Sequence, residues 1–531
     1  MRHSLRVLLG LGLALGAAGC SDYLSGPGVA STSDPNNVTT LTKPGPLYIG
    51  VEEAGPVQRE GQIARFATAY VQQVAGVARQ SVDFDRYGAA PSDVDTYFGA
   101  IYGASNVVTG GGGLLDVHKM QQLARKLNDS LYIGIGKIYE ALIIGYAADI
   151  WGDIPYREAA DSTILQPHFD PQLQIYADLQ QQLDSAINIF LIAAGPTNAG
   201  GAADGSELIY GGRSSDQLRA VYTKVAHSLK ARYYMHVAAV DPTAYPKAVT
   251  EAGLGISTTA DDFLWFHDAT PVGQNIWWQY NSQRAGDIAP SAAFIGILQR
   301  RMTAGVEDSA RIKFYFKLTS DGGYFGYRPT GNKVLPGGAG SGTGKFSTFG
   351  TFIDGLTAPG DFRQPEITFA ETQLIAAEAT WHINCPACTP TTVVPAAQSS
   401  LDAARANRAY GATGGSPVTF PALLPGTALA TLQNIIEEKY TTLFLNPEVW
   451  NDYKRTCLPS LAPAPASVTA TTPGTSPIPG RLPYGLTEIN ANPNTPATSS
   501  AGVTITSVSI NPNQPASCPV LDYTTSTPLA N

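Results

Sequence analysis

Three of the six tryptophans lie in one short segment, 261–280, which reads DDFLWFHDATPVGQNIWWQY. Aromatic rings combine an apolar face with a polar edge, so sugar rings and peptide side chains both stack on them. Pro271 and Gly273 predict a loop here rather than a regular element. The segment is therefore a candidate ligand platform, and the alternative is that its rings fill a core between helices. The candidate contacts are Trp265, Trp277, Trp278 and Tyr280.

A second aromatic group borders a glycine-rich stretch and supplies two further candidate contacts, Tyr324 and Tyr327. The stretch 337–345 ends in a Gly-Lys pair, as a phosphate-binding loop does. Such a loop requires the pattern GxxxxGK[ST], so that backbone N–H groups and a hydroxyl meet the phosphates. Here Ala339 stands in place of the first glycine and Phe346 follows the lysine. Nucleotide binding is therefore not expected.

The acidic residues show no pattern of a catalytic site, and the chain contains neither GxSxG nor HExxH. Adjacent acids stand at 261–262 and 437–438. A glycosidase needs two carboxyl groups roughly 5–10 Å apart across a cleft, and neighbours in sequence seldom converge that way. Glu371 and Glu378 lie about two helical turns apart, and we expect them to be solvated or capping charges. The sequence therefore predicts no catalytic residue.

The seven histidines are scattered along the chain. His227 and His236 lie nine residues apart on one expected helix, a spacing that suits packing better than a shared metal ion. His267 lies among aromatic residues and is a candidate for ligand contact or for a satisfied structural role. We predict neither a metal site nor a cofactor.

Four of the five cysteines form an even set, which in an exported protein indicates disulfides. They are Cys385, Cys388, Cys457 and Cys518. A redox CxxC pair opens a helix after a strand, whereas a Thr-Pro-Thr run after Cys388 predicts a loop. A zinc site would need four thiolates at closer spacing. We expect structural disulfides, and three pairings are open.

The fifth cysteine ends a signal sequence at 1–19. Its basic start is followed by a short apolar run at 7–15, well below the roughly 20 residues that span a bilayer. Small residues then lead to Cys20, the pattern that lipoprotein signal peptidase reads. We expect Cys20 to carry acyl chains, each buried CH₂ of which contributes about 0.8 kcal/mol to membrane binding. The alternative is ordinary secretion with cleavage near Ala18.

Composition narrows the class of partner. The net charge of −9 argues against nucleic acid, whose phosphates require a basic face. An apolar content of 44% suffices for a large core, and only 15% of residues are charged. Glycine, proline and small polar residues are plentiful, which is typical of the loop-rich surface of secreted proteins.

Helical periodicity dominates the chain up to about residue 444. The segment 131–150 is apolar on nearly all sides but carries three charges, which indicates a buried central helix rather than a membrane span. Long helices with short connections suggest antiparallel helix pairs, although no 34-residue repeat is overt. The predicted helices cover 62–80, 131–150, 171–190, 216–241, 290–302, 365–382, 396–409 and 428–444.

Four regions are expected along the chain. The signal peptide at 1–19 is followed by a lipidated linker and extended segment at 20–60. A helical domain covers 61–490, and a polar tail rich in proline, asparagine and threonine covers 491–531. The tail contains a candidate strand at 503–510.

Several blocks, taken in order, resemble the SusD/RagB family, and within it the SusD-like branch with shorter loops. The most recognisable is a helix end followed by WGDxPY, here YAADIWGDIPY at 146–156. The others are DPNN at 34–37, LIYGGR at 208–213 with LKARYYM at 229–235, AETQLIAAEA at 370–379, the segment 436–456, and RLPY at 481–484. Any one block is short, but their common order over most of the chain is specific.

This resemblance implies a mostly α fold, a tetratricopeptide-like helical superhelix with an irregular, loop-rich C-terminal half. It implies that Trp151 and Asp153 are a buried fold signature. It further implies a lipid-anchored nutrient-binding protein at the cell surface, which holds an oligosaccharide or peptide against a SusC-like TonB-dependent outer-membrane barrel. Because ligand surfaces vary in this family, no binding residue is carried over by position.

Two other functions remain open at this stage. A helical-repeat scaffold would bind only other proteins and have no affinity for small ligands. A surface glycoside hydrolase would turn over its substrate and depend on a carboxylate whose removal spares binding. We favour the binding lipoprotein because the lipidation signal, the helices, the aromatic segments and the family blocks agree with it.

Overall fold

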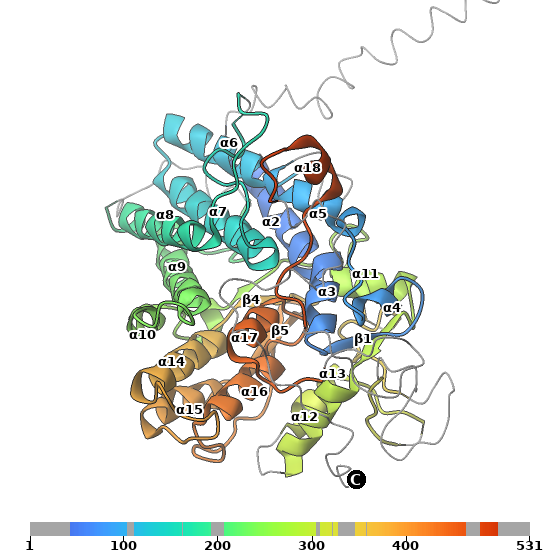
Figure 1. Cartoon of the computed structure of the whole chain (residues 1–531). Coiled ribbons are helices and arrows are strands. Elements are labelled where there is room, and N and C mark those ends of the chain that lie inside the picture. The colour runs from blue at the N-terminus through green and yellow to red at the C-terminus, as the bar shows by residue number, and fades with distance from the viewer. Residues whose placement is uncertain are drawn as a thin grey trace, which may run out of the picture.

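The protein is described by a computed structural model, and Figure 1 shows its mostly helical architecture. The mostly α fold expected from the sequence is confirmed. The structure describes residues 43–103, 111–161, 163–192, 206–303, 308–320, 322–327, 346–356, 358–462 and 478–496.

The N-terminal half consists of helices joined by short connections. They are α2 (Gly45–Glu60), α3 (Gln62–Tyr70), α4 (Ser81–Phe84), α5 (Pro91–Tyr102), α6 (Leu114–Lys126), α7 (Ser130–Trp151), α8 (Gln172–Ile192), α9 (Ser215–Val237) and α10 (Ala244–Leu254). Consecutive helices from α6 to α10 pack side by side, and α14 then packs on α9 and α10 (Figure 1). This succession is the stacked helical arrangement that the sequence predicted.

The second half is less regular and returns to the first. Its helices are α11 (Ile276–Gln283), α12 (Ala292–Thr303), α13 (Ser309–Tyr315), α14 (Phe369–Asn384), α15 (Gln398–Ala406), α16 (Leu432–Thr442), α17 (Glu448–Thr456) and α18 (Leu486–Ala491), with 3₁₀ turns η3 (Thr259–Asp261) and η4 (Pro395–Ala397). Its strands are β2 (Phe263–Leu264), β3 (Ile288–Pro290), β4 (Pro365–Ile367), β5 (Ala409–Thr413) and β6 (Ser416–Thr419), and β1 (Val74–Gly76) joins them from the N-terminal half. Each described sheet has two antiparallel strands, paired β1–β3, β2–β4 and β5–β6.

Helix α7 is the centre of the N-terminal half. The Asp129 carboxylate caps its start by accepting hydrogen bonds from the backbone N–H groups of Leu131 and Tyr132. Gly152, with φ of +81°, ends it in a backbone conformation that favours glycine. Among the described residues it is the one helix long and apolar enough to cross a bilayer, yet 89% of that window is buried inside the protein. It is therefore a core helix, as the sequence predicted.

The helix expected at 62–80 is shorter than predicted, because α3 ends at Tyr70. Gln72 has φ of +57°, and the amide of Gln73 bonds instead to the carbonyl of Tyr440 at 2.8 Å and to the N–H of Leu445 at 2.8 Å. Val74–Gly76 then pairs with β3. Tertiary hydrogen bonds to distant segments thus override the local helical periodicity.

Three other expectations need correction. Gly45–Glu60 is helical, although it falls in the range expected to be linker and extended segment. The helix predicted at 396–409 ends at Ala406, and the chain enters a hairpin whose turn is formed by Gly414 and Gly415, both with positive φ. Part of the segment predicted as a loop at 261–280 is helix α11, because Asn275 caps it by accepting a hydrogen bond from the N–H of Trp278 at 3.1 Å.

A buried ionic network joins α7, α9, α14, α16 and α17. Arg232 is central, because its guanidinium donates to both oxygens of Glu371 at 2.8 Å and to Glu366 at 2.9 Å. Acidic and basic side chains occur in equal number. The network comprises Asp149, Glu366, Glu371, Glu378, Glu448 and Asp452 with Arg59, Arg232, His236, Lys439, Lys454 and Arg455.

The family blocks at 146–156, 229–235, 370–379 and 436–456 meet in this network, and RLPY at 481–484 lies beside it, whereas DPNN at 34–37 lies outside the described residues. Trp151 is fully buried, and its indole N–H donates to the carbonyl of Pro483 at 2.9 Å. The carboxylate of Asp153 accepts from the N–H of Gln172 at 2.8 Å and so caps α8. Tyr484 donates to the Asp153 carbonyl at 2.8 Å. The block at 146–156 is therefore the buried lock between α7 and the closing RLPY segment that the resemblance implied.

Candidate functional site

The described residues form a polar pocket of about 480 Å³. It lies between α6, α7, α8 and the loop that follows α7, and we call it the α6–α8 pocket. Its lining residues are His118, Glu140, Tyr156, Arg157, Ala159, Asp178, Gln181 and Gln182. Sequence analysis did not predict this pocket, since its residues come from four segments that show no shared spacing.

The floor of the pocket is the carboxylate of Glu140, which is 5% exposed. It accepts hydrogen bonds from Gln121 at 3.0 Å, Tyr156 at 2.9 Å and Gln182 at 3.2 Å, and Nε2 of His118 lies 3.5 Å away. Burial acts to raise the pKa of Glu140, but the interactions with His118, Gln121 and Tyr156 outweigh it and lower that pKa. Glu140 is therefore a fixed negative charge at neutral pH.

The aromatic candidates of the segment 261–280 divide into buried and half-buried residues. Trp265 and Trp277 are 2% and 0% exposed, so neither offers a ring face at the surface. The indole N–H of Trp265 donates to Glu366 at 3.0 Å. Tyr280 is buried too, with its hydroxyl 2.6 Å from Ser81. These three side chains therefore pack in the core, which was the alternative to a ligand platform.

Of the four candidate contacts in this segment, Trp278 is the half-buried one. Its indole N–H donates to the carbonyl of Ala358 at 2.9 Å, which fixes the ring between two loops. One loop carries Val272, 92% exposed, and the other carries Leu356, 76% exposed. Both loops therefore carry an exposed apolar side chain, and we call Trp278 with these two loops the Trp278 surface.

The second aromatic group also divides. Tyr324 is half-buried and packs against the core, whereas Tyr327 is 7% exposed and stacks edge-on against Phe346. The glycine-rich stretch beside them lies outside the described residues.

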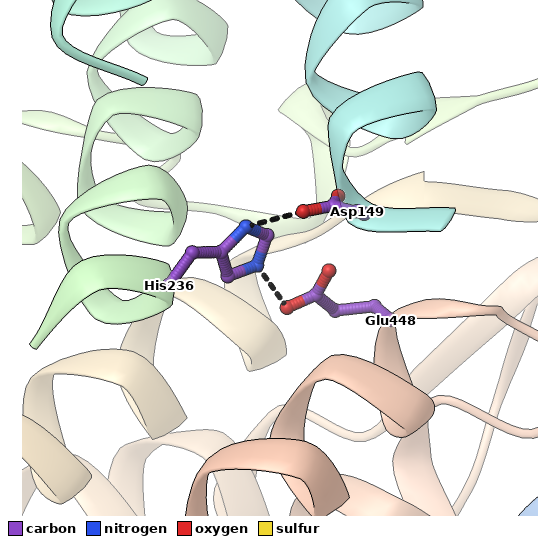
Figure 2. Close-up of side chains that lie close together, drawn as sticks. All are labelled: Asp149, His236 and Glu448. Atoms are coloured by element: carbon purple, nitrogen blue, oxygen red, sulfur yellow. Dashed lines mark hydrogen bonds and ion pairs between the residues drawn. The ribbon is translucent and has the colours of Figure 1, made fainter. Parts of the chain in front are cut away.

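The structure brings together three residues that sequence reasoning kept apart, Asp149, His236 and Glu448. Figure 2 shows the ring of His236 between the two carboxylates, with Nδ1 2.8 Å from Asp149 and Nε2 2.8 Å from Glu448. Burial acts to lower the pKa of His236, but the two carboxylates outweigh it and raise that pKa to about 9. Nε2 is hydrogen-bonded to Glu448, and Nδ1 forms a close ion pair with Asp149, so a carboxylate at each nitrogen favours the imidazolium, whereas a metal would require one nitrogen to be a free acceptor.

This triad belongs to the ionic network and is closed to solvent, since all three residues are buried. The 212 residues between His236 and Glu448 left no local spacing from which to predict it. The other histidines singled out also have carboxylate partners, because His227 lies 2.6 Å from Glu251 and His267 lies 2.9 Å from Glu60.

A second buried acidic site lies between α2 and the segment before α9. Glu52 and Glu207 are 1% and 5% exposed, and no ion pair among the described residues involves either. Tyr48 donates to Glu207 at 2.8 Å, and Tyr222 lies 2.6 Å from the Tyr48 hydroxyl. Burial and the neighbouring Glu207 raise the pKa of Glu52 well above its usual range. We call these two residues the carboxyl pair.

The acidic residues weighed for hydrolysis have structural partners. Asp261 bonds to Arg213 at 3.0 Å and to Lys224 at 2.7 Å, and Asp262 accepts from the N–H of Phe369 at 2.7 Å. Glu371 and Glu378, expected to be solvated or capping, are instead fully buried in the ionic network. Their carboxylates can be buried because Arg232 forms an ion pair with Glu371 and Arg455 forms one with Glu378.

Cys385 and Cys388 form a disulfide, and Cys457 is disulfide-bonded too. The pair at 385–388 follows the C-terminal end of α14, not a helix N-terminus, where redox CxxC thiols are activated. Cys518, the lipidation candidate Cys20 and the candidate strand 503–510 lie outside the described residues.

A protein-family model described as "SusD-like, starch-binding associating with outer membrane" matches residues 54–485. No curated protein matches the chain. Among solved structures, a SusD/RagB family protein from Bacteroides thetaiotaomicron superposes with a TM-score of 0.62 at 17% identity, covering 88% of this chain and 98% of that one.

Two further structures agree. A SusD homolog from Bacteroides fragilis has a TM-score of 0.58 at 18% identity, with 85% and 94% of the two chains covered. A chitin-binding SusD homolog from Flavobacterium johnsoniae has a TM-score of 0.56 at 19% identity, with 86% and 94% covered. These likenesses show the fold, and the family match spans most of the chain. The chain therefore belongs to the SusD-like family of outer-membrane-associated binding proteins.

Proposed function

We propose that this protein is a lipid-anchored receptor of the cell surface, which captures an oligosaccharide or peptide and passes it to a SusC-like TonB-dependent barrel. The observation that carries the proposal is the family match over residues 54–485. The small residues before Cys20 support the lipid anchor, because acylation there would hold the chain at the membrane.

The experiment is a pull-down of tagged, full-length protein from detergent-solubilised outer membrane, with partners identified by mass spectrometry. We expect a large TonB-dependent barrel to be recovered with the wild-type chain. The matched control is Cys20→Ala, which should leave the protein outside the membrane fraction. Recovery of the wild-type lipoprotein alone, under conditions that preserve complexes, would favour a free scaffold or a hydrolase.

For the ligand contact we propose the Trp278 surface, with Tyr324 as a second half-buried aromatic candidate. Trp278 combines a fixed ring with exposed apolar neighbours, whereas Trp265 and Trp277 are covered. Stacking on an aromatic ring contributes about 0.5–1.5 kcal/mol beyond area burial, so Trp278→Ala should weaken ligand binding roughly 3- to 10-fold. Tyr234→Ala is the control, because Tyr234 is a half-buried aromatic on α9. Equal affinity of the two variants would remove Trp278 from the site.

A further inference from the structure

The proposed function does not use the α6–α8 pocket. Its lining residues take no part in the ionic network, the carboxyl pair or either aromatic group. Its volume of about 480 Å³ falls within the roughly 300–1,000 Å³ that small-ligand sites occupy.

The floor of the pocket is held rigidly. Gln121, Tyr156 and Gln182 all donate to the Glu140 carboxylate, and Gln182 is itself fixed, because its carbonyl accepts from Lys137 at 2.7 Å. A ligand group entering here meets a preorganised carboxylate, which reduces the entropy lost on binding.

The rim is held as well. Arg157 binds Asp178 through two parallel hydrogen bonds of 2.8 and 3.0 Å, and Gln174 donates to the same carboxylate at 3.0 Å. The backbone N–H of Arg157 donates to Asp170 at 2.9 Å, which fixes the loop that carries it. Because Arg157 and His118 are 52% and 39% exposed, the pocket opens to solvent on this side.

Several polar groups at the pocket remain available to a ligand. The side-chain amide of Gln181 is exposed and forms no hydrogen bond with the described residues, so it offers one acceptor and two N–H donors. Gln182 uses one of its two amide N–H bonds. Oδ1 of Asp178 accepts from both Arg157 and Gln174, whereas Oδ2 accepts from Arg157 alone and retains one lone pair. Donors and acceptors are therefore interleaved within one small space.

The carboxylates of the pocket already have partners within the protein, which decides the class of ligand. Asp178 is ion-paired with Arg157, and the Glu140 carboxylate accepts three hydrogen bonds. A polyanion would meet two carboxylates and an oligocation would meet Arg157. Hydroxyl groups both donate and accept, and they suit interleaved donors and acceptors. We propose that the α6–α8 pocket binds a small neutral ligand rich in hydroxyl groups, of the size of one or two sugar units.

This site is separate from the Trp278 surface and does not depend on the import proposal, since the pocket is complete in this chain. The test uses the mature full-length chain with glucose, N-acetylglucosamine, maltose and cellobiose at millimolar concentration, and saturation-transfer NMR as the readout. Two variants change the pocket: Gln181→Trp fills it from an exposed position, and Arg157→Ala removes its rim. Asn188→Trp is the matched control, exposed on the same helix and outside the pocket.

We expect at least one sugar to bind the wild-type chain and the Asn188→Trp control alike. Gln181→Trp should weaken that binding at least tenfold, and Arg157→Ala at least threefold, with unchanged circular dichroism. Binding that survives both pocket variants but is lost in Trp278→Ala would overturn this inference and place the sugar at the Trp278 surface. No binding of any probe would also overturn it, and would leave the import proposal to the barrel pull-down.

Discussion

The ionic network and the carboxyl pair both bury carboxyl groups, but they neutralise them differently. In the ionic network each carboxylate has a basic partner, as Glu371 has Arg232 and Glu448 has His236. In the carboxyl pair the described residues supply tyrosine hydroxyls and backbone N–H groups, but no ion pair. In the ionic network, cations balance the negative charge of the carboxylates. In the carboxyl pair, the raised pKa of Glu52 favours its protonated, neutral form.

The difference sets opposite responses to acid. His236 and Arg232 outweigh the effect of burial on Glu448 and hold its pKa well below its usual range, so its contribution to stability is present above an ordinary carboxyl pKa and lost as pH falls. Burial raises the pKa of Glu52, so its contribution is largest in acid and declines as pH rises. Buried acids of one fold can therefore stabilise it in different pH ranges, depending on whether a cation is within reach.

The largest effect should come from removing a cation from the ionic network. Arg232→Ala leaves Glu371 buried without its ion-pair partner, while Glu366 retains Arg59 at 2.7 Å, and breaking a buried ion pair in this way typically costs about 3–5 kcal/mol. We expect a decrease of that order in the free energy of unfolding, measured by urea denaturation. Arg157→Ala is the control, because it breaks an ion pair in which Arg157 is 52% exposed and should leave the free energy of unfolding nearly unchanged. Equal losses in the two variants would contradict the role given to the network.

A smaller effect should come from the proton on His236. Its folded-state pKa of about 9 lies above the usual value, so the imidazolium stabilises the fold fully below about pH 6.5 and loses this effect as pH rises through 9. We expect the wild-type chain to lose on the order of 3 kcal/mol of stability between pH 6.5 and 10, relative to His236→Gln. Urea titrations at several pH values measure this difference. A parallel decline in both proteins would mean that His236 is not the titrating group.

Four of the family blocks recognised in the sequence, at 146–156, 229–235, 370–379 and 436–456, supply residues of this network. Arg232, Glu371, Glu378 and Arg455 lie in the blocks that carry the resemblance, and each is buried with a partner from another block. Because the fold buries both members of each pair, the segments that carry them occur together, and their order along the chain can be recognised. Central helix α7 was predictable for a related reason, since a helix buried on nearly all sides is apolar on nearly all sides.

The candidate site was less predictable because exposure depends on tertiary packing. Trp277 and Trp278 are neighbours in sequence, yet one is fully buried and the other reaches the surface. Local sequence does not distinguish them, because which one points inward depends on how α11 is placed. In the pocket, Gln181 and Gln182 were recognisable only as the polar side of a helix. The hairpin of β5 and β6 was not predicted, although the adjacent glycines Gly414 and Gly415 are typical of a hairpin turn.

The smallest effect, and the sharpest contrast with the network, should come from the carboxyl pair. In Glu52→Gln an amide N–H replaces the retained proton, so the variant can donate to Glu207 at any pH. Between an ordinary carboxyl pKa and the raised value, the folded wild type binds more protons than the unfolded chain, and its stability therefore falls as pH rises. We expect the variant to match wild type near pH 4.5 and to exceed it by about 1 kcal/mol at pH 8. The control is Glu53→Gln, an exposed neighbour on the same helix, which should change stability by less than about 0.5 kcal/mol at either pH. If Glu52→Gln were less stable than wild type by the same amount at both pH values, Glu52 would be a hydrogen-bonded carboxylate that holds no proton, and the contrast between the two buried sites would fail.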